Sequence, residues 1–308
     1  MKFAIVFPGQ GSQAVGMGRS LYEAYPQAKA IFESANAALG FDLQKLCFDG
    51  PVEELKRTAV TQPAVLTVSM AAWAVLKDRG VQAELMAGHS LGEYSALCAA
   101  EAISFADAVR LVHLRGKFMQ EAVPEGQGAM AAVLGLDREK VISICQMIAE
   151  GLVVAANFNS PGQVVISGHK TAVDAAAGKL KEAGAKRVIM LEVSAPFHSP
   201  LMQPAADNLK AELDKIEIKD AKVPVISNVT ALPVQAATDI RKLLVAQVTS
   251  SVEWEKSVQT MVKMGITDFV EVGAGKVLKG LIGKIEPSAK IINVEDQESL
   301  EILFNLVK

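Results

Sequence analysis

The feature that most restricts the fold of this chain is a serine held between two glycines, in Gly88-His89-Ser90-Leu91-Gly92. An apolar segment at 81–87 precedes it, and an alanine- and leucine-rich segment at 91–101 follows it. The first predicts a buried strand and the second a buried helix, so the serine would stand on a sharp strand-to-helix turn. Glycines suit the flanks because side chains there would clash in so tight a turn. The pattern predicts a nucleophile at Ser90, and the alternative is a purely structural bend.

Strands and helices are expected to alternate along most of the chain, beginning with a short apolar strand at 2–7. Outside the middle segment, helices are predicted over 19–39, 62–79, 91–101, 104–122, 200–215, 238–249, 253–264 and 276–285, and strands over 81–87, 223–227, 267–272 and 290–294. This alternation predicts an α/β fold with a mainly parallel sheet covered by helices.

The pattern changes between 126 and 195. Strands are predicted there over 129–136, 153–156, 163–166 and 187–193, and helices over 138–150 and 171–183, the first of them capped by Asp137. The order is β-α-β-β-α-β, which is typical of a ferredoxin-like subdomain. We therefore expect residues 126–195 to be a small subdomain inserted into a larger unit formed by 1–125 and 196–308.

Composition excludes several classes of protein. Of the 308 residues 50% are hydrophobic, which is enough for a sizeable buried core, and the net charge of −3 gives no reason to expect a nucleic-acid partner. The three cysteines have no C-x-x-C spacing, which argues against a disulfide framework and a zinc site. The apolar start before Pro8 is too short for a signal peptide, and no apolar run approaches the roughly 18 residues of a membrane span. We expect a cytoplasmic monomer with no membrane partner.

A serine hydroxyl needs a base before it can attack an acyl carbon, and the chain has four histidines. His89 is expected to point away around the turn, His113 to pack within a helix, and His169 to cap one. His198 follows the last strand of the small subdomain, in an irregular loop where the chain returns to the larger unit, and such a loop suits a catalytic base. His198 is therefore the predicted base. No aspartate stands out as a third member, so a backbone carbonyl is a candidate to orient the imidazole.

Two backbone N–H groups are expected to bind the oxyanion of an acyl-transfer intermediate. The sharp turn brings the N–H of Leu91 to one side of Ser90. The glycine loop FPGQGSQA at 7–14 also fits a dinucleotide-binding pattern, but no second strand ending in an acidic residue follows within about 30 residues. We expect this loop to lie beside the serine instead and to supply the N–H of Gln10.

Arg115 lies in the second predicted helix after the serine, among apolar residues. From the residues alone two interpretations stay open. One is a surface arginine whose stem covers apolar neighbours, and the other is a clamp for a substrate carboxylate.

Taken together, these motifs resemble the malonyl-CoA–acyl carrier protein transacylases of bacterial type II fatty acid synthesis, over nearly the whole chain. The motifs that carry the resemblance are FPGQGSQ at 7–13, GHSLGEYSAL at 88–97, the arginine at 115, ANFNSPGQVVISG at 156–168, FHSPLM at 197–202, QVTSSVEW at 247–254 and EVGAGKVLKGL at 271–281. Several long motifs in one order are far more specific than any one of them.

The resemblance implies an α/β-hydrolase-like large subdomain with a ferredoxin-like insertion. It also implies roles for individual residues: Ser90 as nucleophile, His198 as base, the main-chain carbonyl of Gln247 as the group that orients His198, the N–H groups of Gln10 and Leu91 as oxyanion hole, Arg115 as the ligand of the malonyl carboxylate, and Phe197 as a residue that favours malonyl.

The expected reaction is transfer of a malonyl group from malonyl-CoA to the phosphopantetheine thiol of acyl carrier protein through a malonyl-serine ester. Coenzyme A thioester is a substrate here, and no metal or redox cofactor is expected. The alternatives are a serine thioesterase or esterase, an acyltransferase of a polyketide pathway, and a non-catalytic module that binds coenzyme A or an acyl carrier.

Overall fold

The computed structural model describes residues 3–193 and 195–307, so the predicted strand position Lys2 and the loop residue Ser194 lie outside it. A six-stranded sheet has the order β10-β9-β1-β2-β7-β8. Its strands are β1 (Phe3–Phe7), β2 (Leu85–Gly88), β7 (Val225–Ile226), β8 (Pro233–Val234), β9 (Asp268–Val272) and β10 (Lys290–Val294). All neighbours pair in parallel except β8, which is antiparallel to β7. The predicted mainly parallel sheet is confirmed.

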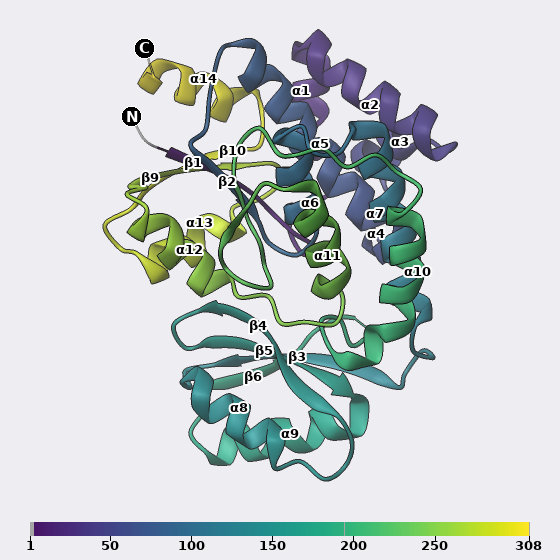
Figure 1. Ribbon diagram of the computed structural model, residues 1–308, viewed down its shortest axis with the longest axis vertical. Coiled ribbons are helices and arrows are strands. Elements are labelled where there is room, and N and C mark those ends of the chain that lie inside the picture. Colours follow the sequence, from purple (N-terminus) through teal and green to yellow (C-terminus); the bar gives the residue numbers. More distant parts are fainter. Residues whose placement is uncertain (1–2, 194, 308) are drawn as a thin grey trace.

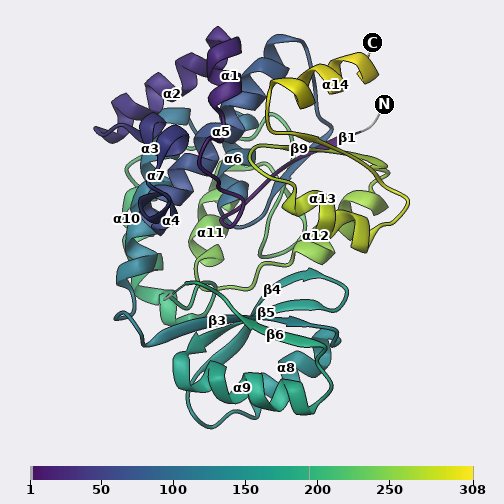
Figure 2. The same ribbon diagram turned by 180° about the vertical axis from the view of Figure 1, so that it is seen from behind.

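Helices cover both faces of this sheet (Figures 1 and 2). They are α1 (Arg19–Ala24), α2 (Pro26–Leu39), α3 (Leu43–Asp49), α4 (Val52–Lys56), α5 (Thr58–Asp78), α6 (Leu91–Ala99), α7 (Phe105–Glu121), α10 (Gln203–Leu213), α11 (Ala237–Gln247), α12 (Trp254–Lys263), α13 (Val277–Ile285) and α14 (Gln297–Val307). Side chains alternate along a strand, so Ile5 and Phe7 pack with α5, α6 and α7, while Ala4 and Val6 pack with α12 and α13.

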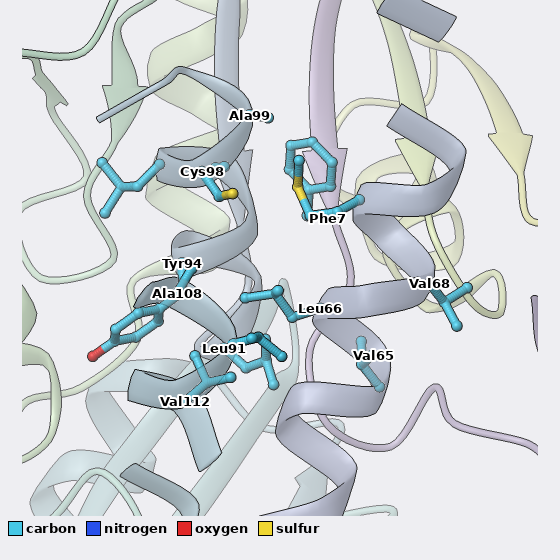
Figure 3. Packing of buried hydrophobic residues seen from close by; sticks show 14 of the residues in the cluster. Phe7, Val65, Leu66, Val68, Leu91, Tyr94, Cys98, Ala99, Ala108 and Val112 are labelled. Carbon is cyan, nitrogen blue, oxygen red and sulfur yellow. The ribbon is translucent and has the colours of Figure 1, made fainter. Parts of the chain in front are cut away.

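The larger core cluster packs against the turn that carries Ser90. Side chains of α5, α6 and α7 meet there beside Phe7 of β1 (Figure 3). By length and hydropathy α5 is apolar enough to cross a membrane, contrary to our expectation that no segment would be. However, 89% of its most apolar stretch is buried inside the protein, where α5 serves as a core helix.

A second sheet of four antiparallel strands has the order β4-β5-β3-β6. Its strands are β3 (Gly128–Leu134), β4 (Val153–Ser160), β5 (Gln163–His169) and β6 (Arg187–Met190), and its helices are α8 (Arg138–Gln146) and α9 (Lys170–Glu182). Both helices lie on the side of this sheet that faces away from the large sheet (Figure 1). The chain order is β3-α8-β4-β5-α9-β6, the order predicted from the sequence.

Several predicted elements differ in detail. The single helix predicted over 19–39 is two helices, because Tyr25 is extended before Pro26, as residues that precede proline usually are. Helix α5 begins four residues before the predicted position 62, since Pro63 is accommodated within its first turns. Asp137 stands at the N-terminus of α8, but its side chain makes no capping hydrogen bond there. The short elements α3, α4 and β8 and the terminal helix α14 were not predicted.

Candidate active site

The serine turn has the geometry that its glycines predict. Ser90 follows β2 and precedes α6, with φ 51° and ψ −107°, a strained conformation of positive φ that costs a non-glycine residue about 1–3 kcal/mol. A Cβ atom on Gly88 would lie 2.0 Å from the backbone of Gly92, and one on Gly92 would lie 2.1 Å from the carbonyl oxygen of Phe7. Glycines are therefore required at both flanks.

Ser90 and His198 are 108 residues apart in the sequence and meet in the structure. Ser90 Oγ lies 2.7 Å from His198 Nε2, and His198 Nδ1 lies 2.9 Å from the main-chain oxygen of Gln247, at the end of α11. Because a carbonyl oxygen only accepts, Nδ1 carries the proton and Nε2 presents its lone pair to the serine hydroxyl. This arrangement prepares the imidazole to accept the serine proton.

His198 is neutral at physiological pH. Burial, and after it the charge of Arg115, lower the pKa of His198 to about 3, although the hydrogen bond to Gln247 opposes the shift. The residue is 4% exposed, and its backbone φ of 57° is also positive. The imidazole is thus held in its unprotonated form close to Ser90 Oγ.

Arg115 of α7 is 1% exposed, which rules out the interpretation as a surface arginine. Its Nη1 donates to Gln62 Oε1 at 2.8 Å, and its Nη2 donates to Gln247 Oε1 at 3.0 Å and to Ser90 Oγ at 3.2 Å. The guanidinium also lies over the Tyr94 ring, 5.3 Å from its centre. Among the described residues, no carboxylate forms an ion pair with it, and Arg115 Nε has no hydrogen-bond partner. A buried cation held by neutral amides is suited to binding an anionic group beside the serine.

The two residues predicted to supply the oxyanion donors both lie next to the turn and line the same cleft as Ser90. Leu91 begins α6, where the first backbone N–H groups of a helix have no intrahelical acceptor. The loop with Gln10 packs tightly against the turn, since a Cβ atom on Gly9 would lie 2.5 Å from the His89 carbonyl oxygen. The backbone N–H of Ser90 itself donates to Asn228 Oδ1 at 2.6 Å and is already engaged.

These residues line a cleft of about 390 Å³ between the two sheets. Gln10, Ser90, Leu91, Arg115, Phe197 and His198 all contribute to it. Phe197 is 8% exposed and directly precedes the histidine. Strands β3, β4 and β5 supply the opposite wall with Met130, Asn157, Asn159 and Val165. An extended acyl thioester can therefore contact both sheets at once.

The other three histidines do not contact Ser90 Oγ in the described structure. His89 Nε2 lies 2.8 Å from Asn159 Oδ1, and its ring packs against Trp254. His113 Nδ1 lies 2.7 Å from the carbonyl oxygen of Ala59. His169 stands at the start of α9 but makes no capping bond, because its Nδ1 accepts from Leu152 N–H at 3.1 Å. Within residues 3–193 and 195–307, no group of three or more His, Cys, Asp or Glu side chains is placed to hold a metal ion.

Sequence reasoning missed three buried polar residues at this site, namely Gln62, Glu93 and Asn228. Gln62 is the buried amide of the largely apolar helix α5, and Glu93 is a charged residue in the apolar helix α6. Asn228 follows a strand of the parallel sheet at its carboxyl end, where ligand sites of α/β folds gather. A polar residue inside an apolar element was the available signal.

A neutral histidine beside a serine on a strained turn, with a buried cation next to the serine, is typical of enzymes that transfer acyl groups through a serine ester. The family model of the acyl transferase domain matches residues 4–295. A relative from Bacillus subtilis (strain 168) is 50% identical over all of this chain and 98% of its own, and one from Escherichia coli (strain K12) is 54% identical over 92% and 93%. Both are malonyl CoA-acyl carrier protein transacylases, and this chain belongs to their family.

Solved structures share the fold. An acyl carrier protein S-malonyltransferase from Vibrio cholerae O1 biovar eltor superimposes with a TM-score of 0.96 at 47% identity, covering 98% of this chain and all of that one. A malonyl-transacylase solved in complex with its type II PKS acyl-carrier protein superimposes with a TM-score of 0.97 at 46% identity, covering 99% of this chain and all of that one. The mixed α/β fold with a parallel sheet is common to all three.

Proposed function

We propose that this chain transfers a malonyl group from malonyl-CoA to the phosphopantetheine thiol of acyl carrier protein. The observation that carries the proposal is the 3.2 Å contact between Arg115 Nη2 and Ser90 Oγ. It places a buried cation within reach of both the reacting oxygen and a carboxylate at the far end of a three-carbon acyl group. Relatives with malonyl CoA-acyl carrier protein transacylase names at 50% and 54% identity support the same substrate.

The reaction has two half-reactions that share one base. Ser90 Oγ gives its proton to His198 and attacks the thioester carbonyl, while the N–H groups of Gln10 and Leu91 stabilise the oxyanion. The C–S bond then breaks, and coenzyme A leaves as a thiol with the proton from His198. In the second half-reaction the carrier thiol gives its proton to His198, attacks the serine ester, and Ser90 regains the proton as its C–O bond breaks. Serine ester and thioester are close in energy, so the exchange is reversible and needs no further cofactor.

The strand order supports the finer description of the fold. In the small sheet, the second, third, first and fourth strands of the segment lie side by side, which is the order of a ferredoxin-like unit. Residues 126–195 form this unit, and residues 1–125 and 196–308 form an α/β-hydrolase-like catalytic subdomain with Ser90 on its nucleophile turn.

Intact-mass measurement tests the covalent step. Mixing the protein with malonyl-CoA should add one malonyl group to the wild-type chain and none to Ser90→Ala. Adding acyl carrier protein with its phosphopantetheine arm should then move the group to the carrier. Absence of an adduct, or an adduct that persists in Ser90→Ala, overturns the proposal, and loss of the adduct to water in the presence of the carrier identifies a thioesterase.

The role of Arg115 predicts a change of acyl preference. Arg115→Ala should lower the rate of malonyl loading about 100-fold, because a buried charge-assisted contact contributes about 2–5 kcal/mol. Loading of the uncharged acetyl group should change little. Arg110→Ala is the matched control, since Arg110 lies on the same helix and pairs with Asp107 at the surface. Equal losses for malonyl and acetyl would contradict the clamp.

A polyketide carrier is the second candidate partner. The specific observation is the likeness to a malonyl-transacylase in complex with a type II PKS acyl-carrier protein. Parallel transfer assays with a fatty acid carrier protein and a polyketide carrier protein distinguish these two candidate partners. The true partner should accept the malonyl group with the higher kcat/KM.

A further inference from the structure

A glutamate that takes no part in the reaction above lies beneath the serine turn. Glu93 is in the first turn of α6 and is 1% exposed. Its Oε2 accepts a hydrogen bond from Gln247 Nε2 at 2.6 Å and another from the backbone N–H of Asn228 at 3.0 Å. One oxygen therefore joins three segments that are far apart in the sequence.

The bond to Gln247 decides which way its side-chain amide faces. An amide has a donating and an accepting end, and Glu93 together with the Ser90 carbonyl, 3.0 Å away, attracts the donating end. The accepting oxygen of Gln247 then faces Arg115 Nη2 at 3.0 Å. The order Glu93, Gln247, Arg115 is a chain of hydrogen bonds with a fixed direction. The same residue, Gln247, holds His198 through its main-chain oxygen.

The bond to Asn228 supports the strained turn. With its backbone held by Glu93, the side chain of Asn228 accepts from Ser90 N–H at 2.6 Å and donates to the Gly88 carbonyl oxygen at 2.7 Å. Asn228 thus bridges Gly88 at the end of β2 and Ser90 at the strained position of the turn. Burial raises the pKa of Glu93 to about 7, and both the carboxylate and the neutral acid offer an accepting oxygen to these two donors.

We infer that Glu93 is a positioning residue for acyl transfer: it orients the Gln247 amide, and through it Arg115, and it fixes Asn228 against the Ser90 turn. The inference rests on the proposed function, because the effect on Arg115 matters only if that residue binds an acyl carboxylate.

Two variants test the accepting oxygen itself. Glu93→Leu removes it, and we expect kcat/KM for malonyl-CoA to fall about 50-fold while acetyl loading falls about fivefold, so that the malonyl-to-acetyl ratio drops about tenfold. Glu93→Gln keeps an accepting oxygen and should restore the ratio to within about threefold of wild type. If Glu93→Leu is not folded by circular dichroism, Glu93→Asp, which withdraws the oxygen by one carbon, should lower the ratio in the same direction.

A double-mutant cycle tests the route through Gln247. In a Gln247→Leu background, which lacks the relaying amide, adding Glu93→Leu should cause little further loss of the ratio. Additive losses would overturn the inference.

A matched control separates positioning from stability. Glu271 is also a wholly buried glutamate, but its oxygens accept from Leu278 and Lys279 N–H at the start of α13. Glu271→Leu should lower the melting temperature and leave the malonyl-to-acetyl ratio unchanged. A Glu93→Leu enzyme that is destabilised but keeps the wild-type ratio and kcat would show that Glu93 is only structural. If wild-type enzyme forms no malonyl-serine, the proposed function itself fails, and the two failures are thereby distinguished.

Discussion

At the scale of single residues, the site is defined by a buried cation whose direct hydrogen-bond partners are neutral. Arg115 is buried and held by the side-chain oxygens of Gln62 and Gln247, which are neutral. Its charge contributes, after burial, to lowering the pKa of His198, and in the proposed reaction it binds the substrate carboxylate. In the proposed reaction, the residue that selects the acyl group therefore also adds to the effect of burial in keeping His198 unprotonated.

The pH dependence of acylation follows from this arrangement. In the proposed reaction His198 acts as the neutral base, and its pKa is lowered to about 3, so the base form persists well below neutrality. The rate of malonyl-serine formation should stay level from about pH 8 to about pH 5, instead of falling below the usual histidine pKa of about 6.5. Single-turnover loading measured by quenched mass spectrometry, with circular dichroism to verify folding at each pH, gives the profile. A rate that falls about tenfold per pH unit below about pH 6.5 would contradict this prediction.

Residue identities were predictable where a motif marks them, and not where burial does. Ser90 was marked by its glycines and His198 by its loop, whereas the residues alone left Arg115 undecided. Glu93 and Asn228 carry no motif signal, because their importance depends on what surrounds them in space. A charged residue in the alanine-rich helix after the serine is visible in the sequence, but its partners at Asn228 and Gln247 lie more than 130 residues away.

At the scale of elements, the site depends on how closely α6 approaches the first strand. Helix α6 starts directly after the turn, and Gly92 in its first turn lies against the end of β1. The predicted strand, turn and helix were confirmed here because local sequence decides all three. The break at Pro26 and the short helices α3 and α4 were missed, since a few residues carry too little periodicity to show.

Gly92→Ala should therefore be among the most damaging small changes in the chain. Its Cβ atom would lie 2.1 Å from the Phe7 carbonyl oxygen. The start of α6 and the end of β1 cannot move apart without displacing Ser90. We expect a loss of unfolding free energy of about 3 kcal/mol or more and little acylation of the folded fraction. Gly178→Ala in α9 is the control, because nothing lies within 4 Å of its added methyl group, and it should be neutral or slightly stabilising. Denaturant unfolding measures the free energy of unfolding of both variants. Equal stability of the two would contradict the close approach of α6 to β1.

At the scale of the whole molecule, the active site lies between two sheets that must keep their relative position. The segment at 250–253, shortly after Gln247, pairs with β4: Phe158 N–H donates to the Val252 carbonyl at 2.9 Å, and Val252 N–H donates to the Ala156 carbonyl at 2.8 Å. The sequence predicted both sheets, but not this junction, because pairing between segments almost 100 residues apart leaves no local pattern. The junction connects the residue that orients His198 to the opposite wall of the cleft.

An ion pair between Arg138 and Glu253 lies at the same junction. Arg138 of α8 donates two hydrogen bonds to the Glu253 carboxylate, both at 2.9 Å, and its guanidinium lies 3.6 Å from the centre of the Phe158 ring. The pair is largely buried and bidentate, so a double-mutant cycle of Arg138→Met and Glu253→Gln should give a coupling free energy of about 1–3 kcal/mol in denaturant unfolding.

The surface pair Lys170–Asp174 is the control for this cycle. Its atoms are only 2.7 Å apart, but both side chains are about half exposed, so its coupling should stay below about 0.5 kcal/mol. Because backbone pairing with β4 remains, Arg138→Met should keep acylation within about threefold of wild type at a temperature where it is folded. Equal coupling for the two pairs would mean that the sheets are held together by their backbone contacts, with no measurable contribution from Arg138 and Glu253.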